Sequence, residues 1–191
     1  MRIFVYCSMN MKFFYSIIVA SVIAVGISSC AKKENYPIIP AITFKNIILY
    51  TPGDSLDVQI NFTDGDGDIG YPAGEADIKP NCYLEYLVDS ITSTGVNTGI
   101  YVPVTTSNID SNATTWDTVA YPYNIPYITP TGSDKALNGI IQIRLYSSVW
   151  RFTSSFFSNV GKSIKFRVWI IDRAGHVSNR ILTDAIIVPS T

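Results

Sequence analysis

Cysteine is scarce in this 191-residue chain, and histidine is scarcer still. The three cysteines are Cys7, Cys30 and Cys82, and His176 is the single histidine. Beyond residue 30, Cys82 is the only thiol, so no disulfide can form within that part of the chain. Structural zinc sites use about four Cys or His ligands, so this composition also argues against zinc.

Positive charge is in short supply too. The sequence has 14 Lys and Arg against 15 Asp and Glu, and two of the basic residues, Arg2 and Lys12, precede residue 30. From residue 30 onward the balance is therefore 12 minus 15, or −3. No stretch gathers Lys and Arg as nucleic-acid-binding surfaces do, so nucleic acid is not an expected partner.

Helical periodicity is missing, and alternation takes its place. The best helix candidate, residues 149–160, is rich in Ser and Thr, which form helices poorly. Between residues 55 and 62, apolar side chains stand at every second position, the pattern of a half-buried strand. Further strand candidates are 42–50, 82–89, 99–105, 115–121, 141–146, 164–170 and 181–188. We predict an all-β fold, a single immunoglobulin- or fibronectin-III-like sandwich of about seven or eight antiparallel strands over residues 41–191.

The longest apolar run lies near the start of the chain. Lys12 precedes the largely apolar stretch 13–27, and small residues then lead to Cys30. This is the build of a secretory signal peptide, and it is shorter than the ~20 residues of a membrane-spanning helix. We expect residues 1–29 to be a cleaved signal peptide. Met11 followed by Lys12 is also a normal opening, so translation can begin at Met11. Residues 30–40, with two prolines and a charge cluster, are predicted to be a tether.

The end of the apolar run, Ile27-Ser28-Ser29-Cys30, resembles the lipobox of bacterial lipoproteins. In that family the cysteine thiol receives a diacylglycerol and the peptide is cut just before it. The resemblance implies that Cys30 becomes the lipid-bearing first residue of a mature protein anchored to a membrane of the cell envelope. We expect the outer membrane, with its periplasmic and surface faces both open.

Three aspartates, Asp64, Asp66 and Asp68, stand at alternate positions directly after the strand predicted at 55–62. Glycines between them let the backbone fold tightly, so the carboxylates can converge. Hard oxygen ligands on such a loop suit Ca²⁺. Glu75 lies eleven residues after Asp64, as in an EF-hand, but Ile69 replaces the glycine that an EF-hand needs.

A second loop strengthens the calcium hypothesis. The strand predicted at 164–170 runs into Asp172, and the loops after the second and the penultimate strand of an immunoglobulin-like sandwich share one pole. We therefore expect Asp172 to approach the three aspartates, and we expect this acidic tip to face away from the anchor. The alternative is two ordinary polar turns, because Asp-Gly is common in turns.

The string Phe62-Thr63-Asp64-Gly65-Asp66-Gly67-Asp68-Ile69-Gly70, together with the lipobox and the turn Asp172-Arg173-Ala174-Gly175-His176, resembles a group of lipoproteins of the Bacteroidota whose role is not characterised. These are predicted immunoglobulin-like domains of the cell envelope. The resemblance covers about a quarter of the chain and implies a location and a fold. It implies no activity.

Three functional hypotheses remain. The first is a non-catalytic protein that binds an envelope protein or serves as a structural accessory. The second is a glycan-binding module that presents Trp116, Tyr121, Tyr123 and Tyr127 to sugar rings, although such tyrosines often pack on the fold instead. The third is a GDSL-type esterase, because residues 53–56 spell Gly-Asp-Ser-Leu. That enzyme would need His176 near Ser55 and an α/β fold, so we expect no catalytic residues.

Overall fold

A computed structural model describes residues 35–50, 55–72, 79–105, 117–128, 130, 135–153 and 157–190. Residues from Asn35 onward form one compact unit. Several predictions lie outside the described residues: the signal peptide, the lipidated Cys30, Glu75 and Trp116. Within the described residues, no helix has the length and apolar character that crossing a membrane requires.

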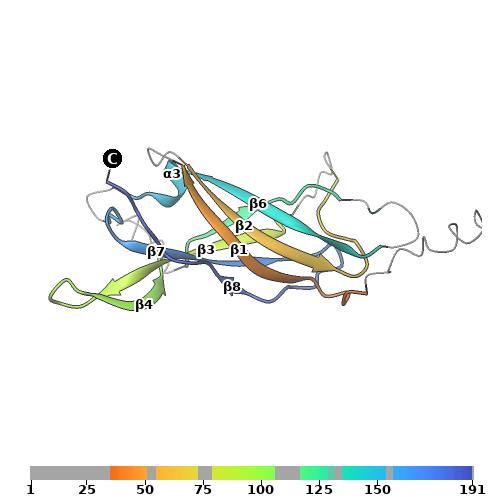
Figure 1. Ribbon diagram of the computed structural model, residues 1–191, viewed down its shortest axis with the longest axis horizontal. Helices are drawn as coiled ribbons and strands as arrows, with labels where there is room; N and C mark the ends of the chain where they lie inside the picture. Colours follow the sequence, from red (N-terminus) through yellow and green to blue (C-terminus); the bar gives the residue numbers. More distant parts are fainter. Residues whose placement is uncertain are drawn as a thin grey trace, which may run out of the picture. The chain divides into compact units, whose positions relative to one another are not determined.

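The described fold is all-β, with two antiparallel sheets (Figure 1). The smaller sheet has the order β1-β2-β6, formed by Ala41–Tyr50, Ser55–Asp64 and Leu137–Tyr146. Strand β2 lies in the middle and pairs along its whole length with β6, from Ser55 opposite Tyr146 to Asp64 opposite Leu137. Its alternation of apolar and polar residues was the clearest strand signal in the sequence, and the predicted strand is confirmed.

The larger sheet is built around β3 (Cys82–Ile91) and β7 (Ser163–Ile170). Strands β4 (Asn97–Pro103) and β5 (Ala120–Tyr123) both pair with β3, each along a different part of it. Strands β8 (Ile181–Leu182) and β9 (Ile186–Ile187) share the other edge of β7 in the same way. Six strands therefore occupy four positions, in the order β4/β5-β3-β7-β8/β9.

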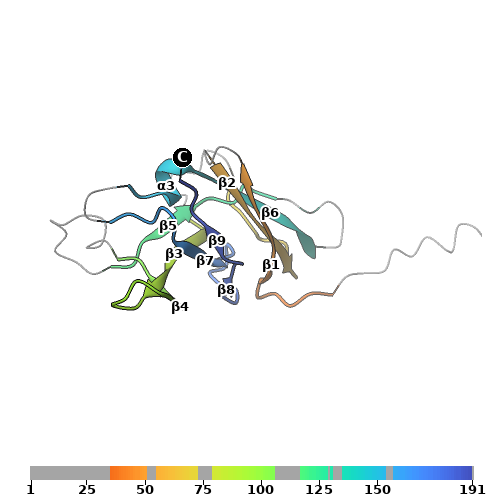
Figure 2. The same ribbon diagram turned by 60° about the vertical axis from the view of Figure 1, so that its left-hand side comes forward.

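The core lies between the two sheets, which Figure 2 shows as separate layers. Leu56, Val58 and Ile60 of β2 are fully buried, as are Ile164, Phe166, Val168 and Ile170 of β7. Burying a side chain of this size stabilises the fold by about 1.5–3 kcal/mol. The period-two pattern thus records which face of each strand meets the opposite sheet.

The structure corrects some predicted bounds. Of the poor helix candidate at 149–160, only residues 149 and 150 are helical among those described, as part of α3 (Ser147–Trp150), a single turn whose Trp150 is buried. The strand predicted at 115–121 begins only at Ala120 among the described residues, and the one predicted at 181–188 divides into β8 and β9. A sheet edge need not be paired along its full length, and sequence alternation alone cannot reveal such an interruption.

Candidate metal centre

Strand β2 ends at Asp64, and the acidic loop (Asp64–Gly70) begins there. The carboxylates of Asp64, Asp66 and Asp68 each offer an oxygen, and these oxygens lie within 4.8 Å of one another. Asp64 is buried, Asp68 is half-buried and Asp66 is exposed. The loop is held in this shape by the backbone amide of Asp68, which donates to Oδ2 of Asp64 at 3.0 Å. This group of oxygens could hold a hard cation such as Ca²⁺.

Two buried carboxylate oxygens of this group have no hydrogen-bond partner. These are Oδ1 of Asp64 and Oδ1 of Asp68. Burial, with added repulsion from Asp66 and Asp68, raises the pKa of Asp64 to about 6. Burial also raises the pKa of Asp68, and the neighbouring charge of Asp172 raises it further. A buried carboxylate oxygen without a partner is costly, so the chemistry of this donor set fits a bound cation.

The turn after β7 packs onto the acidic loop. The amide of Arg173 donates to the carbonyl oxygen of Asp68 at 3.1 Å, and the amide of Ala174 donates to its carboxylate Oδ2 at 3.0 Å. The Arg173 guanidinium donates to the carbonyl oxygens of Ile69 at 3.3 Å and Gly70 at 2.8 Å. The two loops therefore meet at one pole of the fold, where the strand order predicts them to meet.

Asp172 comes close to Asp68 but is directed toward a different partner. Its Oδ1 accepts the amide of His176 at 2.7 Å, and its Oδ2 lies 2.8 Å from Nδ1 of the same residue. Asp172 is fully buried, and this hydrogen bond raises the pKa of His176. Both carboxylate oxygens of Asp172 thus have partners, and it lies outside the group of three aspartates.

The glycines of the acidic loop are needed for space as well as for flexibility. A Cβ placed on Gly65, Gly67 or Gly70 would stand 2.1 to 2.2 Å from a backbone carbonyl oxygen of another segment. Gly67 and Gly70 also have φ values of 72° and 81°, which disfavour other residues. The backbones of three other residues therefore pack directly on the loop: Tyr36 on Gly65, Lys135 on Gly67 and Pro126 on Gly70.

The contact with Tyr36 places the acidic loop beside the last residues of the predicted tether. Gly65 packs directly against the carbonyl groups of Tyr36 and Pro37, which belong to the predicted tether. In both views the segment that leads into β1 runs past the end of β2 (Figures 1 and 2). The acidic loop thus lies beside the end of the tether. In Figure 1 the β3–β4 hairpin lies at the opposite end of the domain.

The tyrosines proposed for glycan binding do not form one exposed platform. Tyr121 and Tyr123 pair with Leu84 and Cys82 of β3, and both are half-buried. Burial raises the pKa of both phenols, that of Tyr123 to about 12. Tyr127 is 43% exposed, and the Arg173 guanidinium carbon lies 4.7 Å from its ring centroid. Among the described candidates, only Tyr127 presents a large exposed surface.

The structure does not bring Ser55 near His176. Ser55 begins β2, whereas His176 belongs to the turn that packs onto the loop at the other end of that strand. Ten residues of strand separate the two ends by about 30 Å. Nothing in this arrangement supports the esterase hypothesis.

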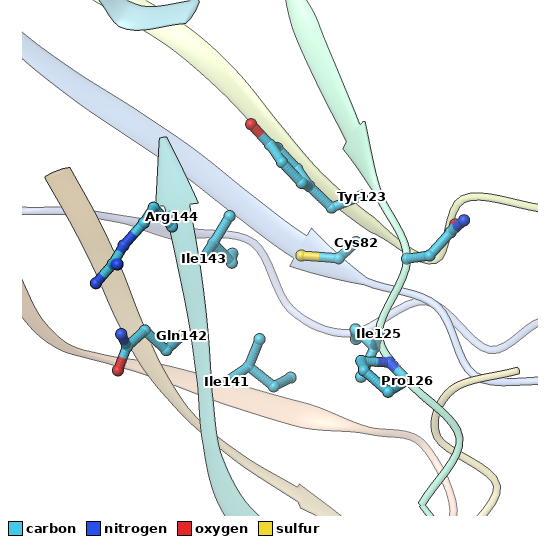
Figure 3. A pocket seen from close by; sticks show the side chains of 9 residues that line it. Cys82, Tyr123, Ile125, Pro126, Ile141, Gln142, Ile143 and Arg144 are labelled. Carbon is cyan, nitrogen blue, oxygen red and sulfur yellow. The ribbon is translucent and has the colours of Figure 1, made fainter. Parts of the chain in front are cut away.

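A small pocket opens between the two sheets beside β6 (Figure 3). Cys82, Ile141 and Ile143 point into it, and Tyr123, Ile125 and Pro126 border it. Its volume of about 130 Å³ is well below the roughly 300–1,000 Å³ of typical ligand pockets. The Cys82 thiol is fully buried, and burial raises its pKa to about 12, so it is no nucleophile.

A more open hollow of about 320 Å³ is lined by Ser147, Ser148, Arg151 and Thr153. Among the described residues, its lining holds hydroxyl groups and one guanidinium.

Sequence reasoning missed three contributors to the candidate metal centre. These are the Arg173 guanidinium, the amide of Ala174 and the backbone of Tyr36 and Pro37. Arg173 follows Asp172 directly, but no local pattern tells which carbonyl groups a guanidinium will reach. No protein-family model matches the chain, and no curated protein matches it.

Proposed function

We propose that this chain is a lipid-anchored, non-catalytic protein of the cell envelope. In this proposal, a Ca²⁺ ion at the acidic loop stabilises the β-sandwich. The domain then binds another envelope protein or serves as a structural accessory. The single observation that carries the calcium part is the pair of buried, unpartnered oxygens on Asp64 and Asp68, within 4.8 Å of a third carboxylate.

The order of the strands supports the immunoglobulin- or fibronectin-III-like assignment. In such sandwiches the first, second and fifth strands share one sheet, and the third, sixth and seventh share the other. Here β1, β2 and β6 share the smaller sheet, and the larger has four positions, which makes seven in total. Strands β4 and β5 together occupy one of those positions, and β8 and β9 occupy another.

The ligand set favours Ca²⁺ over Mg²⁺. The three carboxylates supply part of the six to eight oxygens that Ca²⁺ takes, and exposed Asp66 leaves room for water to supply others. Magnesium demands a near-ideal octahedron and gives up its water reluctantly. We expect an affinity on the order of 10⁻⁴ M, as in extracellular calcium modules.

Calorimetric titration and thermal melts test the calcium site. Calcium at a hundred times its dissociation constant should stabilise the native state by about 2.7 kcal/mol, and chelator should reverse the effect. Asp64→Asn and Asp68→Asn should abolish this response, whereas the exposed control Asp184→Asn should keep it. The metal-free Asp64→Asn variant should also melt above the metal-free parent, because one buried charge is gone. An unchanged melting temperature with calcium would refute the site.

The anchor and the partner class need separate tests. Radiolabelled palmitate should enter the expressed protein and should fail to enter the Cys30→Ser variant. Protease treatment of whole cells then distinguishes a surface face from a periplasmic face.

A glycan array with the lipid-free domain tests the remaining alternative, and binding lost on Tyr127→Ala would favour a glycan ligand over a protein partner.

A further inference from the structure

The last residues of the tether are part of the candidate metal centre's surroundings. Gly65 stands between two of the proposed ligands, Asp64 and Asp66. A Cβ at Gly65 would lie 2.2 Å from the carbonyl oxygen of Tyr36 and 2.7 Å from that of Pro37. Backbone therefore packs on backbone at this point, with no side chain between to absorb a change in the loop.

Two further contacts hold the same segment in place. The Tyr36 hydroxyl accepts a hydrogen bond from Nδ2 of Asn138 at 2.9 Å. Ala41, which follows the segment, pairs with Thr63, the residue before Asp64. The segment 35–40 thus folds back along the end of β2 and is seated against the loop that would bind the ion.

The charges of that loop act on the residues around Gly65. Three carboxylates within 4.8 Å repel one another when no cation neutralises them, and a shift of Asp64 or Asp66 would move Gly65 between them. Such a movement would disturb the surface on which Tyr36 and Pro37 rest, and a bound cation would counter it by drawing the ligands together.

We infer that cation binding at the acidic loop locks residues 35–40 against the domain and so sets the free length of the tether. This inference rests on the proposed calcium site. Six residues released into an extended chain add about 20 Å of reach. Calcium would therefore determine how far the domain stands from the membrane that carries its anchor.

A spin label on the tether measures the coupling directly. The mature chain, residues 30–191, would carry Cys30→Ser and Ile38→Cys, which leaves Cys82 as the one other thiol, and it is buried. Ile38 is 56% exposed, so a nitroxide there should not disturb packing. A matched control carries the label through Val96→Cys, 60% exposed, near the turn between β3 and β4. Calorimetry on each labelled sample reports calcium binding independently.

We expect calcium to shift the spectrum of the label at position 38 from mostly mobile to mostly immobile, and chelator to reverse the shift. The label at position 96 should not respond. In Gly65→Ala, the new methyl group displaces Tyr36, so the label at 38 should stay mobile even in samples where calorimetry shows calcium bound. Calcium binding without any change at position 38 would overturn the coupling and leave the metal site standing. No calcium binding at all would overturn both.

Discussion

The backbone amide of Ala174 donates a hydrogen bond to the carboxylate of Asp68 at 3.0 Å, across 106 residues of sequence. This bond joins the turn after β7 to the loop after β2. It also occupies Oδ2 of Asp68 and leaves Oδ1 buried without a partner. Backbone donors therefore hold this pole of the two-sheet fold together on one side, and carboxylate oxygens remain available for a cation on the other.

Removing the Arg173 side chain should loosen this pole. Arg173→Ala deletes the hydrogen bonds to the carbonyl oxygens of Ile69 and Gly70, and we expect a loss of about 2 kcal/mol in the free energy of unfolding. Arg180→Ala is the matched control, because that exposed guanidinium stacks on Trp169 and should contribute at most about 1 kcal/mol. Urea denaturation of both variants provides the comparison. Equal losses would mean that Arg173 does not bridge the loops in solution.

Gly70 should tolerate no side chain. Gly70→Ala places a Cβ 2.1 Å from the carbonyl oxygen of Pro126 at a φ of 81°, so we expect a loss of about 3 kcal/mol or more. Gly161→Ala measures the cost of a positive φ alone, because φ is 76° there and no atom lies within 4 Å of the added Cβ. That variant should lose only about 1 kcal/mol. Similar melting temperatures for the two variants would contradict the close packing at Gly70.

The metal-free protein should become more stable as the pH falls from about 7.5 to 5. The folded-state pKa of Asp64 is raised to about 6, so its destabilising charge is lost as the pH falls through that value. The pKa of His176 is also raised, so its contribution is fully present below about 6.5 and is lost at higher pH. Between about pH 7.5 and 5, both groups therefore make the metal-free protein more stable as the pH falls.

Thermal melts in chelator at several pH values measure this dependence. Saturating calcium should weaken or reverse it, since protons then compete with the ion for Asp64. The metal-free Asp64→Asn variant should show a smaller rise toward pH 5. A melting temperature that falls steadily toward pH 5 in chelator would show that these carboxylates are not crowded in the folded protein.

Asn159 should contribute strongly to stability, because it links buried groups of Tyr86, Trp150 and Phe152. Its Nδ2 donates to the Tyr86 hydroxyl and to the carbonyl oxygen of Trp150, and its Oδ1 accepts the amide of Phe152 at 2.8 Å. Asn159→Ala leaves these buried groups without their partner, at a cost of about 3 kcal/mol. Tyr86→Phe removes one hydroxyl and should cost about 1 kcal/mol. Chemical denaturation that ranks the two variants in the reverse order would refute this network.

The strands of the core were predictable because their signal is local. The alternation at Leu56, Val58 and Ile60 predicts a strand with one buried face, and those three side chains are fully buried. Burial on the opposite face was not predictable. Asp57 is fully buried as well, because Arg144, 87 residues later, forms a bidentate ion pair with it at 2.8 and 2.9 Å. Nothing near Asp57 in the sequence announces that partner.

For the candidate metal centre, too, the sequence predicted the local features and not the distant contacts. Alternate aspartates separated by glycines predicted that three carboxylates would converge, and local geometry brings them together, since the Asp68 amide bonds to Asp64 four residues away. The loop's surroundings could not be predicted. No pattern near the aspartates indicates that Tyr36 and Pro37 pack against Gly65.

Sequence alone determined the period of each strong strand and the spacing of the acidic ligands, because both follow from the geometry of neighbouring peptide units. Tertiary structure decided which carboxylates keep unpartnered oxygens, that Asp172 turns to His176, and that the tether rests on the acidic loop. These depend on which distant backbone groups arrive at one pole when the two sheets close, and that arrangement is set by packing of the whole core.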